Sequence, residues 1–261
     1  MKKSKPREEE NPRDIDKELN AARDIGDSFK SQNFDLFELV RGLKQKSNLT
    51  EAQKLGLELF IFRLMTSKVV NGVAPISTGV IIDLDRVVNA CVKNNLKYRV
   101  CSKFSGVPVK FREDDLKFTA TFFKSGKVNV VGLQNDEPSH LQRVVGVLQK
   151  YQIDFFGFRV LASSTKRLAN RVYAISIPKV LDLSNLQIFN TLSGWKNIKY
   201  NSQTFPGVRL KFENFRSKAL LFKTGSIIVT GVISRHCKEQ LLKELVLMLS
   251  EYLNVLNNIK R

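Results

Sequence analysis

The sequence predicts an α+β fold made of two similar halves, each an antiparallel sheet that helices cover on one face. One observation is a long internal repeat, because the order F, V, KF, F, K-S/T-G, V-x-G in residues 104–132 recurs in residues 204–231. Equivalent residues lie 99 or 101 positions apart, as Asn71 and Asn170 do for the first spacing. Solenoid units are far shorter, roughly 20–50 residues, so this repeat indicates a duplicated half-domain. The other observation is that strand-like alternation and helical stripes follow the same order in both copies.

Two segments precede the repeats. Residues 1–27 are rich in charge and poor in large apolar groups, which predicts a disordered tail. Its basic cluster at 2–7 fits either a localisation signal or a solubilising tail. Residues 28–66 are expected to form a helical extension: one helix with a stripe at 36–43, and a second behind a capping box of Thr50 and Gln53. The expected buried face of the second helix is Ala52, Leu55, Leu59 and Phe62. This extension either packs on the repeats or binds a partner.

Repeat 1 is assigned to residues 67–165 and repeat 2 to residues 166–261. In repeat 1 a strand near 69–74 precedes a helix over 83–94, strands up to Gly132 and a helix from about 138. In repeat 2 we expect a strand near 168–176, a helix near 183–192, strands up to Gly231 and a long helix from Ser234. Gly225 stands where a tight hairpin turn requires a positive φ.

The second face of the predicted sheet is also apolar. In repeat 2 one parity holds Leu220, Phe222, Ile228 and Thr230, and the other parity is equally apolar. A face that met only water would be polar, so either both faces are buried in protein or the open face meets a flat apolar ligand. Basic residues stand at the strand ends, at positions 103, 110, 124, 127, 209, 211, 216, 218 and 223. An apolar face bordered by cations is typical of a nucleic-acid groove, because cations meet phosphates and apolar groups meet bases.

The net charge and the residue composition indicate which kinds of partner and site to expect. The formal net charge is +18, and residues 1–30 hold 8 basic and 8 acidic side chains, so the excess belongs to the repeats and the helical extension. Such a surface favours nucleic acid as the partner, or less often an anionic membrane or an acidic partner. With 3 cysteines that lack CxxC spacing and 2 histidines, we expect unpaired thiols and neither a metal site nor a cofactor. No stretch approaches the length of a membrane span, and the start lacks a signal-peptide core, so we expect a soluble intracellular protein without a membrane or small-molecule partner.

Residues 68–255 resemble the TATA-box-binding protein family, on the duplication and on the motifs FPGV at 205–208, LFKTG at 221–225 and VTG at 229–231. The resemblance implies a saddle: a curved antiparallel sheet whose concave face binds the DNA minor groove and whose convex helices bind general transcription factors and the RNA polymerase machinery. Insertion of phenylalanine wedges that bend the DNA is the established behaviour of that family. The resemblance also implies an A·T-rich promoter as the ligand, and the nucleus, a viral factory or a host nucleus as the location.

The resemblance assigns roles residue by residue. It implies kinking phenylalanines at Phe104, Phe123, Phe205 and Phe222, and asparagines that read A·T pairs at Asn71 and Asn170. The remaining DNA-contacting positions that it implies are Val73, Val172, Lys110, Lys211, Lys127, Asn129, Val131, Leu220, Ile228 and Thr230. No catalytic residue is expected.

The chain also departs from the family. Repeat 1 has Thr121, Asn129 and Val131 where repeat 2 keeps the family's Leu220, Ile228 and Thr230. We therefore expect the two halves to read DNA differently, with G·C pairs tolerated better under repeat 1. Residues 201–204 are NSQT, where the family carries acidic residues that hold transcription factor IIB. This divergence is typical of a paralogue, or of a relative from a distant eukaryote or a virus.

Two other functions are compatible with parts of the pattern. A saddle that binds only proteins, with weak or no specific DNA binding, would not need exposed phenylalanines and asparagines on its sheet. A nuclease or glycosylase would need clustered carboxylates, and the sequence EDD at 113–115 reads as a solvated turn. The leading hypothesis is a non-enzymatic minor-groove transcription initiation factor.

Overall fold

The computed structural model describes residues 42, 48–134, 137–151, 168–195, 197–212 and 216–260. The expected tail at 1–27 and most of the expected first helix at 36–43 lie outside these residues; Gly42 is helical. Three of the described helices cover the sheet of repeats 1 and 2 as predicted: α4 (Leu84–Lys93), α5 (Pro138–Lys150) and α6 (Arg235–Ile259). A fourth, α3 (Glu51–Thr66), precedes repeat 1.

One antiparallel sheet of ten strands runs through both repeats in the described part of the chain. Its order is β2-β3-β4-β5-β1-β6-β10-β9-β8-β7, which reads the same way from either end once the repeats are exchanged. In repeat 1 the strands are β1 (Asn71–Ser77), β2 (Lys97–Tyr98), β3 (Gly106–Glu113), β4 (Leu116–Phe123) and β5 (Lys127–Leu133). In repeat 2 they are β6 (Asn170–Ser176), β7 (Ile198–Lys199), β8 (Gly207–Lys211), β9 (Lys218–Phe222) and β10 (Ser226–Val232). The α+β fold class is confirmed.

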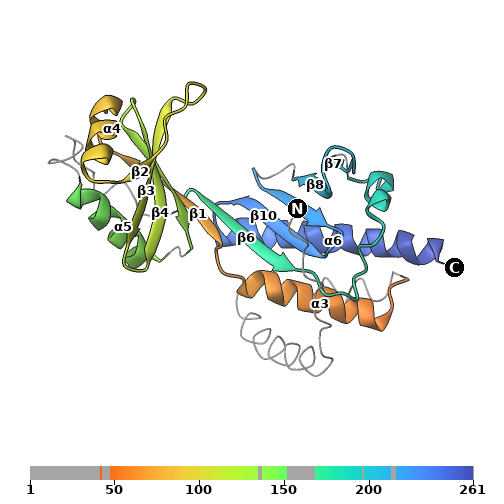
Figure 1. Cartoon of the computed structure of the whole chain (residues 1–261). Helices are drawn as coiled ribbons and strands as arrows, with labels where there is room; N and C mark the ends of the chain where they lie inside the picture. Colours follow the sequence, from red (N-terminus) through yellow and green to blue (C-terminus); the bar gives the residue numbers. More distant parts are fainter. Residues whose placement is uncertain are drawn as a thin grey trace.

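The two repeats meet where β1 pairs with β6. The register places Asn71 opposite Val172 and Val73 opposite Asn170. This short ladder is the middle of the curved sheet, with repeat 1 on one side and repeat 2 on the other (Figure 1). The duplication therefore brings four residues that lie almost 100 positions apart in sequence into one central cluster.

Helices pack on one face of the sheet. The helices α4 and α5 lie against repeat 1, whereas α3 and α6 run side by side along repeat 2 (Figure 1). Alternate strand residues, such as Ala74 and Ile76 of β1, are fully or almost fully buried under these helices. We call this the covered face, and the opposite side the open face.

The first helix of repeat 2 differs from the expectation. The helical pattern at 183–192 forms one short 3-10 helix, η4 (Leu186–Thr191). Residues with low helix propensity stand at both of its ends. The side-chain amide of Asn190 also forms its hydrogen bonds with a later loop. Its Nδ2 donates to the carbonyl of Tyr200, and its Oδ1 accepts from the Tyr200 N–H. The Phe189 ring still packs into the core, stacked on Tyr252 of α6 with ring centroids 4.5 Å apart.

The buried face of α3 was predicted correctly only at Leu59, which is 1% exposed. Ala52 is exposed, and Leu55 and Phe62 are only half-buried. The helix also buries Leu57, Phe60, Ile61 and Leu64 completely. These four residues follow the i, i+3, i+4, i+7 spacing of a different stripe. The helix carries apolar residues on nearly every side, so periodicity alone does not select the stripe that meets the sheet.

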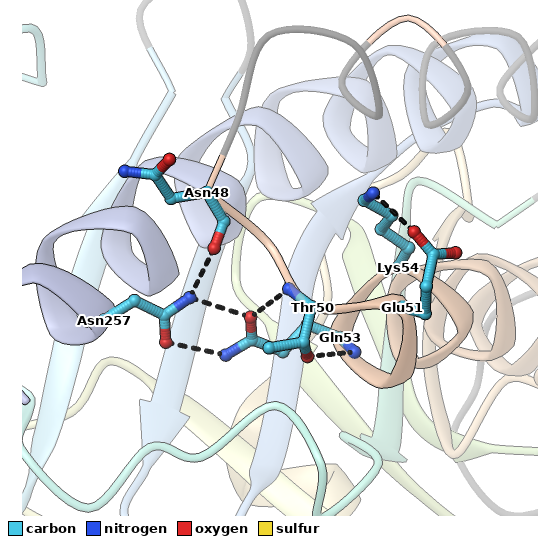
Figure 2. A network of polar contacts seen from close by, with 6 residues as sticks. All are labelled: Asn48, Thr50, Glu51, Gln53, Lys54 and Asn257. Atoms are coloured by element: carbon cyan, nitrogen blue, oxygen red, sulfur yellow. Dashed lines mark hydrogen bonds and ion pairs between the residues drawn. The ribbon is translucent and has the colours of Figure 1, made fainter.

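The capping box at the start of α3 was predicted correctly, and it also joins α3 to α6. The Thr50 Oγ1 accepts from the Gln53 N–H at 3.2 Å, and the Thr50 N–H donates to Gln53 Oε1 at 3.0 Å. Asn257 of α6 exchanges hydrogen bonds of 2.9 and 3.1 Å with the Gln53 amide and donates to the Asn48 carbonyl (Figure 2). The Gln53 side chain, which is part of the capping box, thus also attaches α3 to repeat 2.

The other end of α3 is held by Lys238 of α6. Its Nζ donates to the carbonyls of Met65 and Ser67 at 3.1 and 3.3 Å and lies 4.2 Å from the centroid of the Tyr173 ring. Only 8% of Lys238 is exposed. A cation near the last carbonyls of a helix is favourable because those carbonyls have no partner within the helix. The part of the extension that contains α3 therefore packs on repeat 2, as one of the two expectations had it.

Candidate nucleic-acid interface

Every candidate DNA-contacting residue lies on the open face or at its ends. The alternation on β1 buries Gly72, Ala74 and Ile76 and leaves Asn71 and Val73 on the open side. The same alternation on β5, β6, β9 and β10 leaves half-buried Asn129, Val131, Asn170, Val172, Leu220, Ile228 and Thr230 on that side. The open face is therefore a largely apolar surface with asparagines near its centre.

The two central asparagines are held in the same orientation. The N–H of Gly132 donates to Asn71 Oδ1 at 2.9 Å, and the N–H of Gly231 donates to Asn170 Oδ1 at 2.7 Å. A backbone N–H can only donate, so each carboxamide turns its oxygen to the glycine. The Nδ2 donors remain for a ligand, and A·T pairs present only acceptors in the minor groove.

The two glycines lie at register shifts of the sheet, where their N–H groups point toward the asparagine oxygens. Gly132 and Gly231 have φ of +95° and +82°. They lie where the pairing of β1 with β5, and of β6 with β10, shifts its register. A Cβ on Gly231 would stand 2.6 Å from the carbonyl oxygen of Arg216. Both the left-handed backbone and this close approach require glycine.

The four candidate wedge residues form two ring pairs, one at each end of the open face. Phe104 and Phe123 have centroids 5.8 Å apart, and Phe205 and Phe222 have centroids 5.7 Å apart. Phe104 is 48% exposed and the other three rings are half-buried, so all four are accessible from solvent. The guanidinium of Arg209 lies 4.4 Å from the centroid of Phe205.

Glycine makes room for each ring pair. A Cβ on Gly106 would approach Phe123 Cε1 to 2.9 Å and Phe104 Cε1 to 3.1 Å. A Cβ on Gly207 would lie 3.0 Å from both Phe205 and Phe222 and 2.9 Å from a backbone oxygen. The rings therefore pack directly over the backbone at the start of β3 and β8.

Cations face one another across the outer strands of the open face. The register pairs Lys97 with Lys110 and Arg112 with Lys117 in repeat 1. In repeat 2 it pairs Lys199 with Arg209 and Lys211 with Lys218. Directly opposed like charges destabilise a sheet. This arrangement is therefore suited to a polyanion that neutralises both members of each pair.

The repeat 1 cations surround a cleft of 590 Å³. Its lining includes Lys97, Lys110, Arg112 and Lys117, with Thr119 and Asn71 nearer the centre of the sheet. Sequence reasoning named Lys110 and Lys211 but did not include Lys97, Arg112, Lys117 or Lys199 among the contact residues. The strand parity they share with Lys110 or Lys211, together with the cross-strand register, is the signal that identifies them. Lys127 lies exposed at the start of β5.

Acidic side chains of repeat 1 pair with cations of the covered side. Glu113 forms an ion pair with Lys150 of α5, and Asp115 with Arg143 of the same helix. The Arg143 hydrogen bond lowers the pKa of Asp115. The expected turn is confirmed, since Asp114 and Asp115 form it and are exposed. The ion pairs of Glu113 and Asp115 add that this β3–β4 turn is attached to α5.

Within the described residues, no group of three or more His, Cys, Asp or Glu side chains is placed to hold a metal ion. Cys91, Cys101 and Cys237 are all free thiols. None of the described helices combines the length and apolar character needed to cross a membrane.

Comparison with known proteins identifies the same two halves. The model of the family described as transcription factor TFIID, or TATA-binding protein, matches residues 66–151 and 165–252. The chain is 27% identical to the TATA-box-binding protein of Pyrococcus horikoshii over 185 residues, which is 71% of this chain and 90% of that protein. It is 27% identical to the Archaeoglobus fulgidus protein of the same name over 63% of this chain and 84% of that one.

A solved structure has the same fold. The Methanococcus jannaschii TBP superposes with a TM-score of 0.53 at 23% identity, covering 70% of this chain and 98% of that one. All of α3 except its last residue, Thr66, precedes the family match, which begins at residue 66.

Proposed function

Because this chain belongs to the TATA-binding protein family, we propose that it binds A·T-rich promoter DNA through the minor groove and acts in transcription initiation. The observation that carries the proposal is the orientation of Asn71 and Asn170, whose oxygens are occupied by Gly132 and Gly231. Two fixed donors at the centre of an apolar surface suit the acceptors of A·T pairs. The apolar residues around them leave the amino group of guanine without an acceptor.

We propose that the outer cations bind phosphates on both sides of the groove. The opposed pairs of repeat 1 and repeat 2 would lose their mutual repulsion on binding, because phosphates supply the missing negative charge. The apolar middle and the charged outer strands divide the interface into a base-reading part and a backbone-positioning part.

We further propose that the two ring pairs bend the DNA. Phe104 and Phe123 at one end, and Phe205 and Phe222 at the other, are accessible and lie at the ends of the apolar surface. Insertion of an aromatic ring replaces stacking contacts that an opened base step loses, which is how members of this family bend DNA. Two pairs would produce two kinks.

The covered side then remains available to proteins. We propose that its helices help to nucleate assembly of the initiation complex, that the protein has no enzymatic activity, and that it acts in the nucleus, or in a viral factory if its source is viral. The turn at 201–204 carries no carboxylate, so a partner that docks at this end must recognise amides and hydroxyls.

A mobility-shift comparison tests the proposal. Two duplexes of equal length, one with an A·T-rich centre and one with a G·C-rich centre, are titrated with the full chain at one fixed salt concentration. The proposal expects tighter binding of the A·T-rich duplex. Equal and weak binding of both would favour the alternative of a saddle that binds only proteins.

A further inference from the structure

A third asparagine, Asn129, lies on the open face and has no counterpart in repeat 2. The residue 99 positions later is Ile228. We propose that Asn129 reads a base pair directly and lets the half-site under repeat 1 accept a G·C pair that repeat 2 excludes. This inference rests on the proposed function, since it needs DNA on the open face.

The surroundings of Asn129 distinguish it from the central asparagines. It lies on β5, half-buried, with Thr121 opposite on β4 and Pro75 opposite on β1. Whereas Asn71 and Asn170 are fixed by glycine N–H groups, no described residue forms a hydrogen bond with the Asn129 carboxamide. The neighbouring Pro75 also has no N–H to offer.

A carboxamide without a partner can present either of its ends. With its NH₂ turned outward it donates to adenine N3 or thymine O2, and with its oxygen outward it accepts from the N2 amino group of guanine. Ile228 can do neither, and its cross-strand neighbour Leu220 is also apolar. A guanine amino group over these two residues would lose its water without gaining an acceptor.

Thr121 contributes less than the sequence suggested. Only 9% of it is exposed. A Cβ built on Gly106 would be 2.8 Å from the Thr121 Cγ2, so the methyl group packs against the glycine beneath the Phe104–Phe123 pair. Tolerance of G·C therefore depends on Asn129 rather than on both polar residues.

The difference between the halves predicts an orientation. The fold has two similar halves, so the protein can sit on an A·T-rich site in either direction. On a site with one G·C pair in one half, it should bind with repeat 1 over that half, because only Asn129 offers guanine an acceptor. We expect this orientation to be favoured by about tenfold, within the range that one mismatched base pair typically costs.

A DNA-cleaving reagent attached to the protein can show in which orientation the protein binds its site. Cys101 is half-buried beside Phe104, whereas Cys91 and Cys237 are buried, so a DNA-cleaving iron chelate can be attached selectively near the repeat 1 ring pair. The labelled chain is bound to a duplex whose A·T-rich site carries one G·C pair. Cleavage is expected at the end of the site that holds the G·C pair. A Ser202→Cys variant in a Cys101→Ala background labels the exposed 201–204 turn and should cleave the opposite end.

Reciprocal substitutions make the test specific. The double variant Asn129→Ile with Ile228→Asn should reverse the orientation, and Asn129→Ala alone should remove the preference. Unfolding of the free variants in urea confirms that they are folded. If the chain binds the all-A·T site but shows no orientation preference on the site with one G·C pair, the inference alone is overturned. A preference that the Asn129–Ile228 swap does not change overturns it in the same way. Absence of binding to the all-A·T site overturns the proposed function and this inference together.

Discussion

The backbone N–H of Gly132 donates to the side-chain oxygen of Asn71 across 2.9 Å, from a strand 61 residues further along the chain. Gly231 and Asn170 repeat the relationship in the other half at 2.7 Å. Each bond selects one of the two orientations of a carboxamide and leaves the amino group for the ligand. The proposed selectivity for A·T pairs thus depends on backbone irregularities as well as on the asparagines.

Replacing the fixed donors by acceptors should abolish selective binding. In Asn71→Asp or Asn170→Asp the Gly N–H keeps its acceptor, so the fold is preserved, but the group that faces the DNA becomes an anion. We expect affinity for an A·T-rich duplex to fall by at least about 30-fold, from the lost hydrogen bonds and the repulsion between carboxylate and groove acceptors. Asn89→Asp on the exposed surface of α4 makes the same change in net charge and should have little effect. Equal losses for all three variants, measured by fluorescence anisotropy, would show that charge alone is responsible.

The opposed cations should determine the salt dependence of binding. The logarithm of the association constant should fall linearly with the logarithm of salt concentration, with a slope of about −0.9 per phosphate contact. Lys110→Ala, Lys211→Ala and Lys117→Ala should each reduce the steepness by about one unit. Lys243→Ala, on the exposed part of α6, removes the same charge from the covered side and should leave the slope unchanged. Slopes that do not distinguish these variants would remove the outer strands from the interface.

The ring pairs should control bending separately at each end. Phe205→Ala should reduce the bend of a bound duplex, because alanine cannot fill an opened base step. Fluorescence energy transfer between dyes at the two ends of the duplex measures the bend. Phe205→Leu retains an apolar wedge and serves as the matched variant, with a bend between those of the wild-type and alanine proteins. If the alanine variant binds with an unaltered bend, Phe205 is not inserted.

The extension helix α3 should contribute to the stability of repeat 2. Lys238→Met leaves the carbonyls of Met65 and Ser67 without their donor and removes the cation from the Tyr173 ring. We expect a loss of about 1–3 kcal/mol in the free energy of unfolding by urea. Lys243→Met on the same helix is the control, since Lys243 is exposed. Equal stability of the two variants would mean that α3 does not depend on this attachment.

The sequence was informative wherever a local pattern determines the structure. The duplicated alternation correctly predicted that Leu220 and Ile228 share a face, and Gly225 has the predicted positive φ, at +75°. The N-cap Asp83 and the N-cap Ser234 begin helices at the expected places. These features depend on residues only a few positions apart.

Features that depend on distant contacts were not predictable in the same way. The bond between Gly132 and Asn71 requires a register shift between β1 and β5, which leaves no periodic signal in either strand. The stripe of α3 that is buried is selected by α6 and β6, and the attachment through Lys238 joins residues 171 to 173 positions apart. The cation pairs of the outer strands likewise became visible only with the cross-strand register.

Inosine substitution tests the central claim most directly. An I·C pair lacks the guanine amino group and therefore presents the minor-groove pattern of an A·T pair, while its major groove resembles G·C. Three duplexes that differ only in whether the centre is A·T, I·C or G·C are compared by competition mobility shift with the wild-type chain. Minor-groove reading through Asn71 and Asn170 predicts that the A·T and I·C duplexes compete similarly, and that G·C competes at least about tenfold less well. If I·C behaved like G·C instead, the protein would not be reading the minor groove through these residues.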